Sequence, residues 1–247
     1  MKTQMHNALD VMKEAIKTGL DKNLRSSSGM SGGNAYLMKS AIDSGKLDDN
    51  VFNRAVAYAL ATSETNACMG KIVAAPTAGA SGVLPAVLVA ASEIYNIDDE
   101  KLVGALYLAG DIGMRIAKAA SLSGAECGCQ AECGSAAAMA AAAMVFLMDG
   151  SSGQSEHAAA LALKSLLGLV CDPVAGLVEV PCVKRNANCT SLAITSANMA
   201  LAGIESYIPF DEVVLAMKQI GQSMSSELKE TAQGGCAATD TGKKLQA

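Results

Sequence analysis

The chain has 247 residues and a formal net charge of −5, and 51% of its residues are hydrophobic although only 3% are aromatic. A chain of this length can bury a large core, and without a run of Lys and Arg it has no electrostatic footprint for nucleic acid. The longest apolar run, residues 136–148, falls short of the roughly 20 residues needed to cross a bilayer, and the mixed-charge N-terminus is unlike a secretory signal. We therefore expect a soluble cytoplasmic protein without a membrane partner.

Helical periodicity dominates the chain, and its apolar residues are mostly Ala, Leu, Val, Ile and Met. Gly19 is a stop signal for the first helix, and Asp98 or Asp99 is a cap for a later one. Only residues 71–76 look extended, and no internal repeat or linker divides the chain. We predict one all-α domain over residues 1–247, a compact multi-helix domain with Gly/Pro-rich turns. Helices are expected at residues 1–17, 35–44, 50–63, from about 83, 98–121, 135–149, 155–167, 186–206 and 211–231.

Two Gly-rich turns precede predicted helices and are candidates for binding an anionic group. Turns of this kind present free N–H groups at a helix start, where the helix dipole favours negative charge. Short Gly/Ser turns are nevertheless more often only turns. The residues concerned are Ser31, Gly32, Gly33, Thr77, Ala78, Gly79, Ala80, Ser81 and Gly82.

The eight Cys residues are unexpected in a chain without an export signal. A reducing cytoplasm makes a disulfide framework improbable, so they are buried thiols or metal ligands. Cys129, Cys171 and Cys182 lie beside Gly or Pro turns, where thiolates and free N–H groups suit an iron–sulfur cluster. A zinc site is less well matched, since no C-x₂-C pair is present and His6 and His157 lie in ordinary helical contexts. Spacing alone leaves metal binding and simple burial open.

Four segments carry a resemblance to a known family. The chain resembles the α subunit of the iron–sulfur-dependent L-serine dehydratases in VAAPTAGASGVLPAVL, SGAECGCQAECGSAAAMAAAA, LGLVCDPVAGLVEVPCVKRNA and ETAQGGCAATDTGKKL. The resemblance implies that Cys129, Cys171 and Cys182 hold a [4Fe–4S] cluster. The remaining cysteines would be small buried or semi-buried residues: Cys68, Cys127, Cys133, Cys189 and Cys236.

The resemblance also implies a reaction, the deamination of L-serine to pyruvate and ammonia without pyridoxal phosphate. Three thiolates leave one iron without a protein ligand, and in the family that iron binds the substrate's hydroxyl and carboxylate. Both Gly-rich turns fall in family motifs and become candidates for holding the substrate. Arg185 and Asn186 directly follow the third cysteine motif and are further candidates for reaching substrate or cluster. The alternative for Arg185 is a surface ion pair.

The catalytic base is not identified in this chain. Neither His6 nor His157 belongs to a family motif, and the family's Ser-Ser-His-Thr segment lies on a separate β subunit or domain. We therefore expect a serine dehydratase β subunit as partner, in an αβ oligomer or with a homodimer of this chain. The family's single-chain members end in a tail that can block the open iron, and we do not expect this block here because no Cys stands at the C-terminus. Competing interpretations are a related lyase for L-threonine or L-cysteine and a non-catalytic, metal-binding helical subunit.

Overall fold

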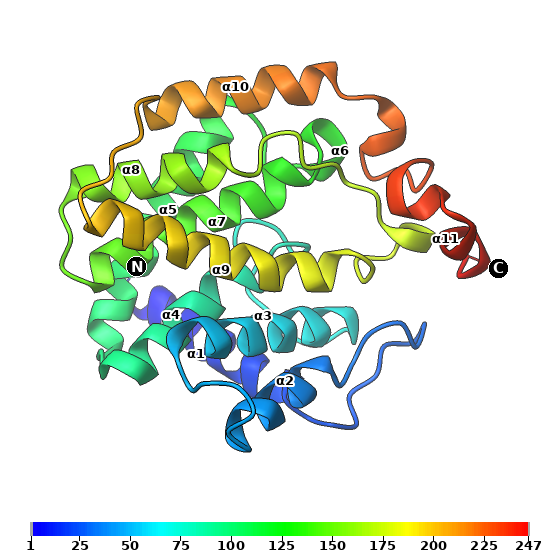
Figure 1. Ribbon diagram of the computed structural model, residues 1–247, viewed down its shortest axis with the longest axis horizontal. Helices are drawn as coiled ribbons and strands as arrows, with labels where there is room; N and C mark the ends of the chain where they lie inside the picture. Colours follow the sequence, from blue (N-terminus) through cyan, green and yellow to red (C-terminus); the bar gives the residue numbers. More distant parts are fainter. Residues whose placement is uncertain (1, 247) are drawn as a thin grey trace.

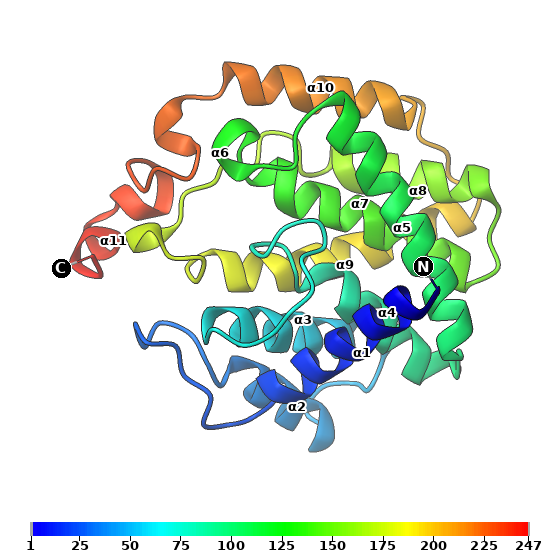
Figure 2. The ribbon, with the colours of Figure 1, turned by 180° about the vertical axis from the view of Figure 1, so that it is seen from behind.

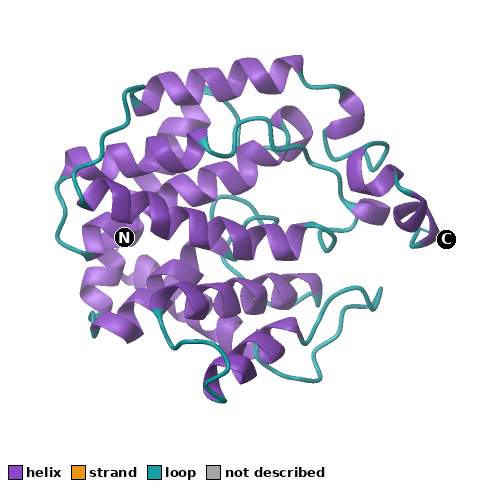
Figure 3. Ribbon diagram, in the orientation of Figure 1, coloured by secondary structure: helices purple, strands orange, loops and turns teal. Residues whose placement is uncertain are grey.

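The computed structural model describes residues 2–246, and in that range it contains eleven α-helices and no β-strand, so the all-α prediction is confirmed (Figure 3). Short π- and 3₁₀-helical segments connect some of the helices. The helices are α1 (Lys2–Gly19), α2 (Asn34–Asp43), α3 (Val51–Ala67), α4 (Val83–Tyr95), α5 (Asp99–Ala119), α6 (Gly124–Cys127), α7 (Ser135–Leu147), α8 (Ser152–Lys164), α9 (Cys182–Leu201), α10 (Phe210–Ser223) and α11 (Asp240–Lys244).

Helix α7 lies at the centre of the fold and packs against α4, α5, α8 and α9 (Figure 1). Its sequence is almost entirely Ala and Met, and small side chains let four neighbouring helices approach it closely. With the preceding π-helical turn it forms an apolar stretch, Gln130–Leu147, that is long enough to cross a membrane. Inside this protein 89% of that stretch is buried, which is the pattern of a core helix.

Helix α3 is a second packing centre, in contact with α1, α2, α4 and α9. Gly19, at the end of α1, lets the two backbones touch, because a Cβ atom there would lie 1.9 Å from the carbonyl oxygen of Ala61. Helices α1, α2 and α3 form one side of the molecule and α10 the opposite side (Figure 2). The core between them includes Leu9, Leu88 and Met144.

Several predicted boundaries need correction. Helix α10 ends at Ser223 rather than residue 231, because Met224 turns to extended backbone with ψ 136° and a 3₁₀ turn, η3 (Ser226–Leu228), follows. Helix α9 begins at Cys182, earlier than the predicted residue 186, directly after Pro181. The predicted cap is confirmed for Asp98, whose side chain accepts the Lys101 N–H at 2.9 Å.

The arrangement brings three chain segments to one end of the molecule. Helices α7 and α9 both start at the end where the C-terminal segment and α11 lie (Figure 1). The loop between α8 and α9 passes the same place, where Cys171 forms an isolated parallel bridge with Lys229. The Gly- and Pro-rich turns predicted from the sequence are concentrated here.

Candidate metal centre

Two of the three predicted cysteine ligands come together with a carboxylate. Cys129 directly precedes the π-helical turn η1 (Gln130–Gly134), and Cys171 lies in the loop after α8. Their sulfur atoms and a carboxylate oxygen of Glu132 lie within 4.8 Å of one another. Cys182, the first residue of α9, is buried like the other two and free of any disulfide. The two thiols and the acidic oxygen of Cys129, Cys171 and Glu132 form a set able to bind a metal, and Cys182 lies outside this 4.8 Å group.

Charge is distributed unequally over the three thiols. Hydrogen bonds from the Cys133 and Cys171 thiols lower the pKa of Cys129 to about 3, and the nearby Arg185 guanidinium acts in the same direction. Burial raises the pKa of Cys182 to about 12, and the Cys129 charge adds to that rise. The hydrogen bond to Cys129 and burial raise the pKa of Cys171 well above its usual range. A bound cation would reverse both increases, because metal ligation requires the thiolate.

The backbone of Cys171 is fixed by the C-terminal segment. The Cys171 N–H donates to the carbonyl of Leu228 at 2.9 Å, and the Glu230 N–H donates to the carbonyl of Cys171 at 2.8 Å. Residues far apart in the sequence therefore set the position of this thiol, and the sequence analysis had no local pattern from which to predict it.

Arg185, predicted as a substrate- or cluster-contacting residue, binds the loop that carries Cys171. Its Nη1 donates to the carbonyl of Val170 at 2.9 Å and lies 2.7 Å from Oδ1 of Asp172. The other Asp172 oxygen accepts the Cys236 N–H at 2.6 Å. Asp172 was missed in the sequence analysis, although it follows a predicted ligand directly. Together, these contacts link α9, the loop that carries Cys171 and the C-terminal segment.

Glu132 was also missed in the sequence analysis, although its carboxylate lies within 4.8 Å of the sulfur atoms of Cys129 and Cys171. Its Oε1 accepts a hydrogen bond from Thr77 Oγ1 at 2.7 Å, and its Oε2 lies 4.0 Å from Cys171 Sγ. Burial raises the pKa of the Glu132 carboxyl to about 7; the Thr77 hydrogen bond opposes this rise, and the Cys129 charge adds to it. The sequence signal was its position three residues after Cys129, which places both within one helical turn.

The turn over residues 77–82 leaves donors unused beside this carboxylate. The N–H groups of Ala78, Gly79 and Ala80 donate to no acceptor within residues 2–246. Ala80 is buried, Gly79 is partly buried and Ala78 is exposed. A buried N–H without an acceptor is rare in folded proteins, so this turn is suited to bind an anion. The Ser81 hydroxyl is buried and likewise has no partner in that range.

Asn186, another predicted substrate-binding residue, holds this turn against α9. Its Oδ1 accepts the Gly82 N–H at 3.0 Å. Its Nδ2 donates to the carbonyl of Gly79 at 2.8 Å and to that of Cys182 at 3.0 Å. The side chain is 1% exposed, and both of its polar atoms are used within the protein. Its side chain therefore links the 77–82 turn to the backbone of Cys182 and holds the two in fixed positions.

The other Gly-rich turn already holds an anion of the protein itself. The fully buried Glu64 accepts the N–H groups of Gly32 and Asn34 through Oε1, at 3.2 and 3.0 Å, and that of Ala35 through Oε2 at 3.2 Å. The neighbouring Ser31 is buried with an unpartnered hydroxyl. Its role with Gly32 and Gly33 in substrate binding stays a prediction, with Glu64 as an internal competitor.

The remaining titratable candidates lie outside this group. His6 pairs with Glu100 at 3.0 Å, and Nδ1 of His157 accepts the Ser206 N–H at 3.1 Å. Among the cysteines expected to be buried or semi-buried, Cys236 is instead exposed. Cys133 is buried as expected, with its sulfur 3.5 Å from that of Cys129.

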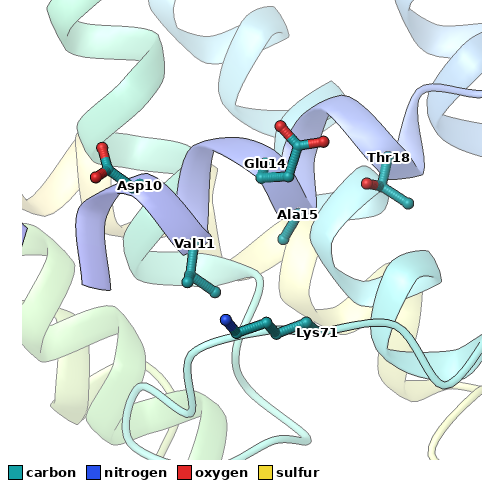
Figure 4. A pocket seen from close by; sticks show the side chains of 6 residues that line it. All are labelled: Asp10, Val11, Glu14, Ala15, Thr18 and Lys71. Carbon is teal, nitrogen blue, oxygen red and sulfur yellow. The ribbon is translucent and has the colours of Figure 1, made fainter. Parts of the chain in front are cut away.

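Two surface hollows lie near residues considered above. One, of about 320 Å³, borders the turn at Ala78 and is lined also by Leu177, Val178 and Glu179. The other, of about 380 Å³, lies between α1 and the Lys71 segment, with Asp10 and Glu14 on its rim (Figure 4). No cysteine lines either hollow; the first is bordered by Ala78 of the turn, whereas the second is lined by none of the predicted site residues.

Comparison with known proteins shows similarity over nearly the whole chain. A family model described as serine dehydratase alpha chain matches residues 1–237. A probable L-serine dehydratase alpha chain of Bacillus subtilis is 52% identical over 244 residues, or 98% of this chain and 81% of that protein. The L-serine dehydratase alpha chain of Peptoniphilus asaccharolyticus is 47% identical over 248 residues, 98% of this chain and 85% of that protein. An L-serine dehydratase of Streptomyces coelicolor is 46% identical over 182 residues, but only 40% of its length is covered.

Proposed function

This chain belongs to the serine dehydratase alpha-chain family, and we propose on that premise that it is the catalytic α chain of an L-serine ammonia-lyase. The reaction is the deamination of L-serine to pyruvate and ammonia. The names of relatives at 52% and 47% identity support the substrate. The single observation that carries the proposal is the meeting of Cys129, Cys171 and Glu132 beside a turn with free N–H groups.

A [4Fe–4S] cluster is part of the proposal, with Cys129, Cys171 and Cys182 as its ligands. The donor set fits, because thiolates are the usual ligands of such clusters and all three thiols are buried and free. The missing side chain of Gly124 leaves space beside Cys171, where a Cβ atom would lie 3.1 Å from the sulfur. When bound, the cluster supplies an iron that acts as a Lewis acid toward the substrate hydroxyl.

The protein's own groups would orient the substrate. The free N–H groups of Ala78, Gly79 and Ala80 are suited to the substrate carboxylate, with Asn186 holding the turn in place. The Arg185–Asp172 pair would keep the Cys171 loop in register with the C-terminal segment. Burial of Ala80, Asp172 and Asn186 limits access of water to this side of the site.

The base that removes the α-proton is proposed to come from a β partner. Both histidines of this chain have other partners away from the thiols, His6 with Glu100 and His157 with Ser206. The description of the family as an alpha chain supports a second subunit. The proposal places the assembly in the cytoplasm, because eight free thiols suit a reducing compartment.

Activity of the assembled enzyme tests this function. The chain is purified without oxygen, alone and with its β partner. The 2-oxo acid product is followed after addition of each amino acid, as pyruvate from L-serine or L-cysteine and as 2-oxobutanoate from L-threonine. We expect pyruvate from L-serine, with a higher kcat/KM than for the other two amino acids, and a large gain when the β partner is present. Equal or better turnover of another amino acid would reject L-serine as substrate. Lack of turnover of all three by an iron-loaded αβ complex would reject the lyase function.

A further inference from the structure

The buried or partly buried acidic groups around the site differ in whether their oxygens are already used. Both oxygens of Glu64 accept backbone N–H groups, and both oxygens of Glu179 accept serine hydroxyls, at 2.6 and 2.8 Å. Asp172 is shared between Arg185 and the Cys236 N–H. Glu132 differs from these three, because within residues 2–246 its Oε2 accepts no N–H or O–H hydrogen bond and has the sulfur of Cys171 at 4.0 Å. As a metal ligand that sulfur would have no proton to donate.

Glu132 also lacks a positive partner. Within residues 2–246, no Lys, Arg or His nitrogen lies within ion-pair distance of its carboxylate. A carboxylate removed from water without a cation is unfavourable, and binding a cation relieves that cost. The environment of Oε2 is therefore one in which an incoming cation would be held tightly.

Two glycines keep the space around this carboxylate open. A Cβ atom on Gly124 would lie 2.7 Å from Oε2, and one on Gly79 would lie 3.1 Å from Oε1. Gly79 also belongs to the turn in which the N–H groups of residues 78–80 have no acceptor within the described range. An unpaired anion and a set of unpaired N–H donors thus lie side by side, which matches the ammonium and carboxylate groups of an α-amino acid.

We propose that Glu132 binds the α-ammonium group of the substrate through Oε2, opposite the N–H groups of the 77–82 turn. The inference rests on the proposed function, since it names the residue that recognises the amino group in that reaction. Thr77 holds Oε1 at 2.7 Å and so fixes the direction of the other oxygen. Thiolates are the usual protein ligands of iron–sulfur clusters, and three are present, which leaves Oε2 for the substrate.

The test separates ammonium recognition from other roles by using a ligand without the amino group. Glu132→Gln keeps the size of the side chain and an acceptor for Thr77 but removes the charge. The cluster-loaded protein is titrated with L-serine and, separately, with 3-hydroxypropanoate, and binding is read from the change in the cluster's visible and electron paramagnetic resonance spectra. Glu126→Gln, on an exposed carboxylate, is the matched control.

We expect the Kd for L-serine to rise about 10- to 100-fold in Glu132→Gln, because one charge-assisted hydrogen bond is lost. The Kd for 3-hydroxypropanoate should change less than about threefold, within the scatter of a neutral substitution. Equal weakening of both ligands, or unchanged binding of both, overturns the inference. So does a loss of iron or a changed ligand-free spectrum, which would make Glu132 a cluster ligand. A wild-type cluster that does not respond to L-serine rejects the proposed function itself, and the inference with it.

Discussion

Replacing Asn186 by Ala should destabilise the protein and loosen the substrate-binding turn at the same time. The side chain makes three hydrogen bonds, of 2.8, 3.0 and 3.0 Å, to Gly79, Cys182 and Gly82. At about 0.5–1.5 kcal/mol each, their loss amounts to about 2–4 kcal/mol of unfolding free energy. Because the turn then loses its brace, the KM for L-serine should rise while the iron content stays near that of the wild type.

Urea unfolding of the anaerobically purified chain, with iron content and KM measured on the same preparation, checks this expectation. Asn188→Ala, on the exposed face of the same helix, is the matched control and should change stability by less than about 0.5 kcal/mol. A rise in KM without a loss of stability would refute the reasoning, because it would mean that Asn186 contacts the substrate directly and that its bonds to the turn contribute little.

Three further substitutions test separate parts of the structure. Glu64→Gln should lower the unfolding free energy by about 2–3 kcal/mol, seen as a lower urea midpoint, because charge-assisted bonds to the N–H groups at the start of α2 are lost. Ser135→Ala should raise the unfolding free energy by about 1 kcal/mol, seen as a higher urea midpoint, since this buried hydroxyl on α7 has no partner in the described range and Ala favours the helix. Asp172→Asn should speed loss of visible absorbance from the loaded protein in air, because the Arg185 pair that holds the Cys171 loop is weakened. Unchanged midpoints or decay rates would contradict the respective assignment.

The helices were predictable because their signals are local. In helix α1 the buried residues Leu9, Met12 and Ile16 recur at helical spacing, and Asp98 caps α5 through the expected side-chain bond. The predicted end of α10, at residue 231, was wrong because apolar residues continue past Ser223. In the structure the backbone leaves the helix there, and Lys229 forms a bridge with Cys171. That pairing joins residues far apart in sequence, and no local pattern encodes it.

The carboxylates illustrate the same limit at the site. Glu64 lies in the part of α3, residues 57–65, in which every residue is buried, so its burial comes from helices packing all round α3. Its hydrogen-bond partners could not be predicted, because they depend on a turn in which Gly32 adopts a φ of 118°. Glu132 lies in a π-helical turn, whose extra residue per turn shifts side-chain directions away from those of an ideal helix. Its neighbours Thr77 and Cys171 come from two other loops.

Iron and sulfide content after anaerobic reconstitution tests the central claim of a three-cysteine cluster most directly. The wild-type chain should be brown and hold about four iron and four sulfide ions. Cys182→Ala should lose most of both, whereas Cys189→Ala, a buried cysteine outside the ligand set, should keep them. A colourless wild-type chain, or a Cys182→Ala variant with full iron and an unchanged spectrum, would contradict the account.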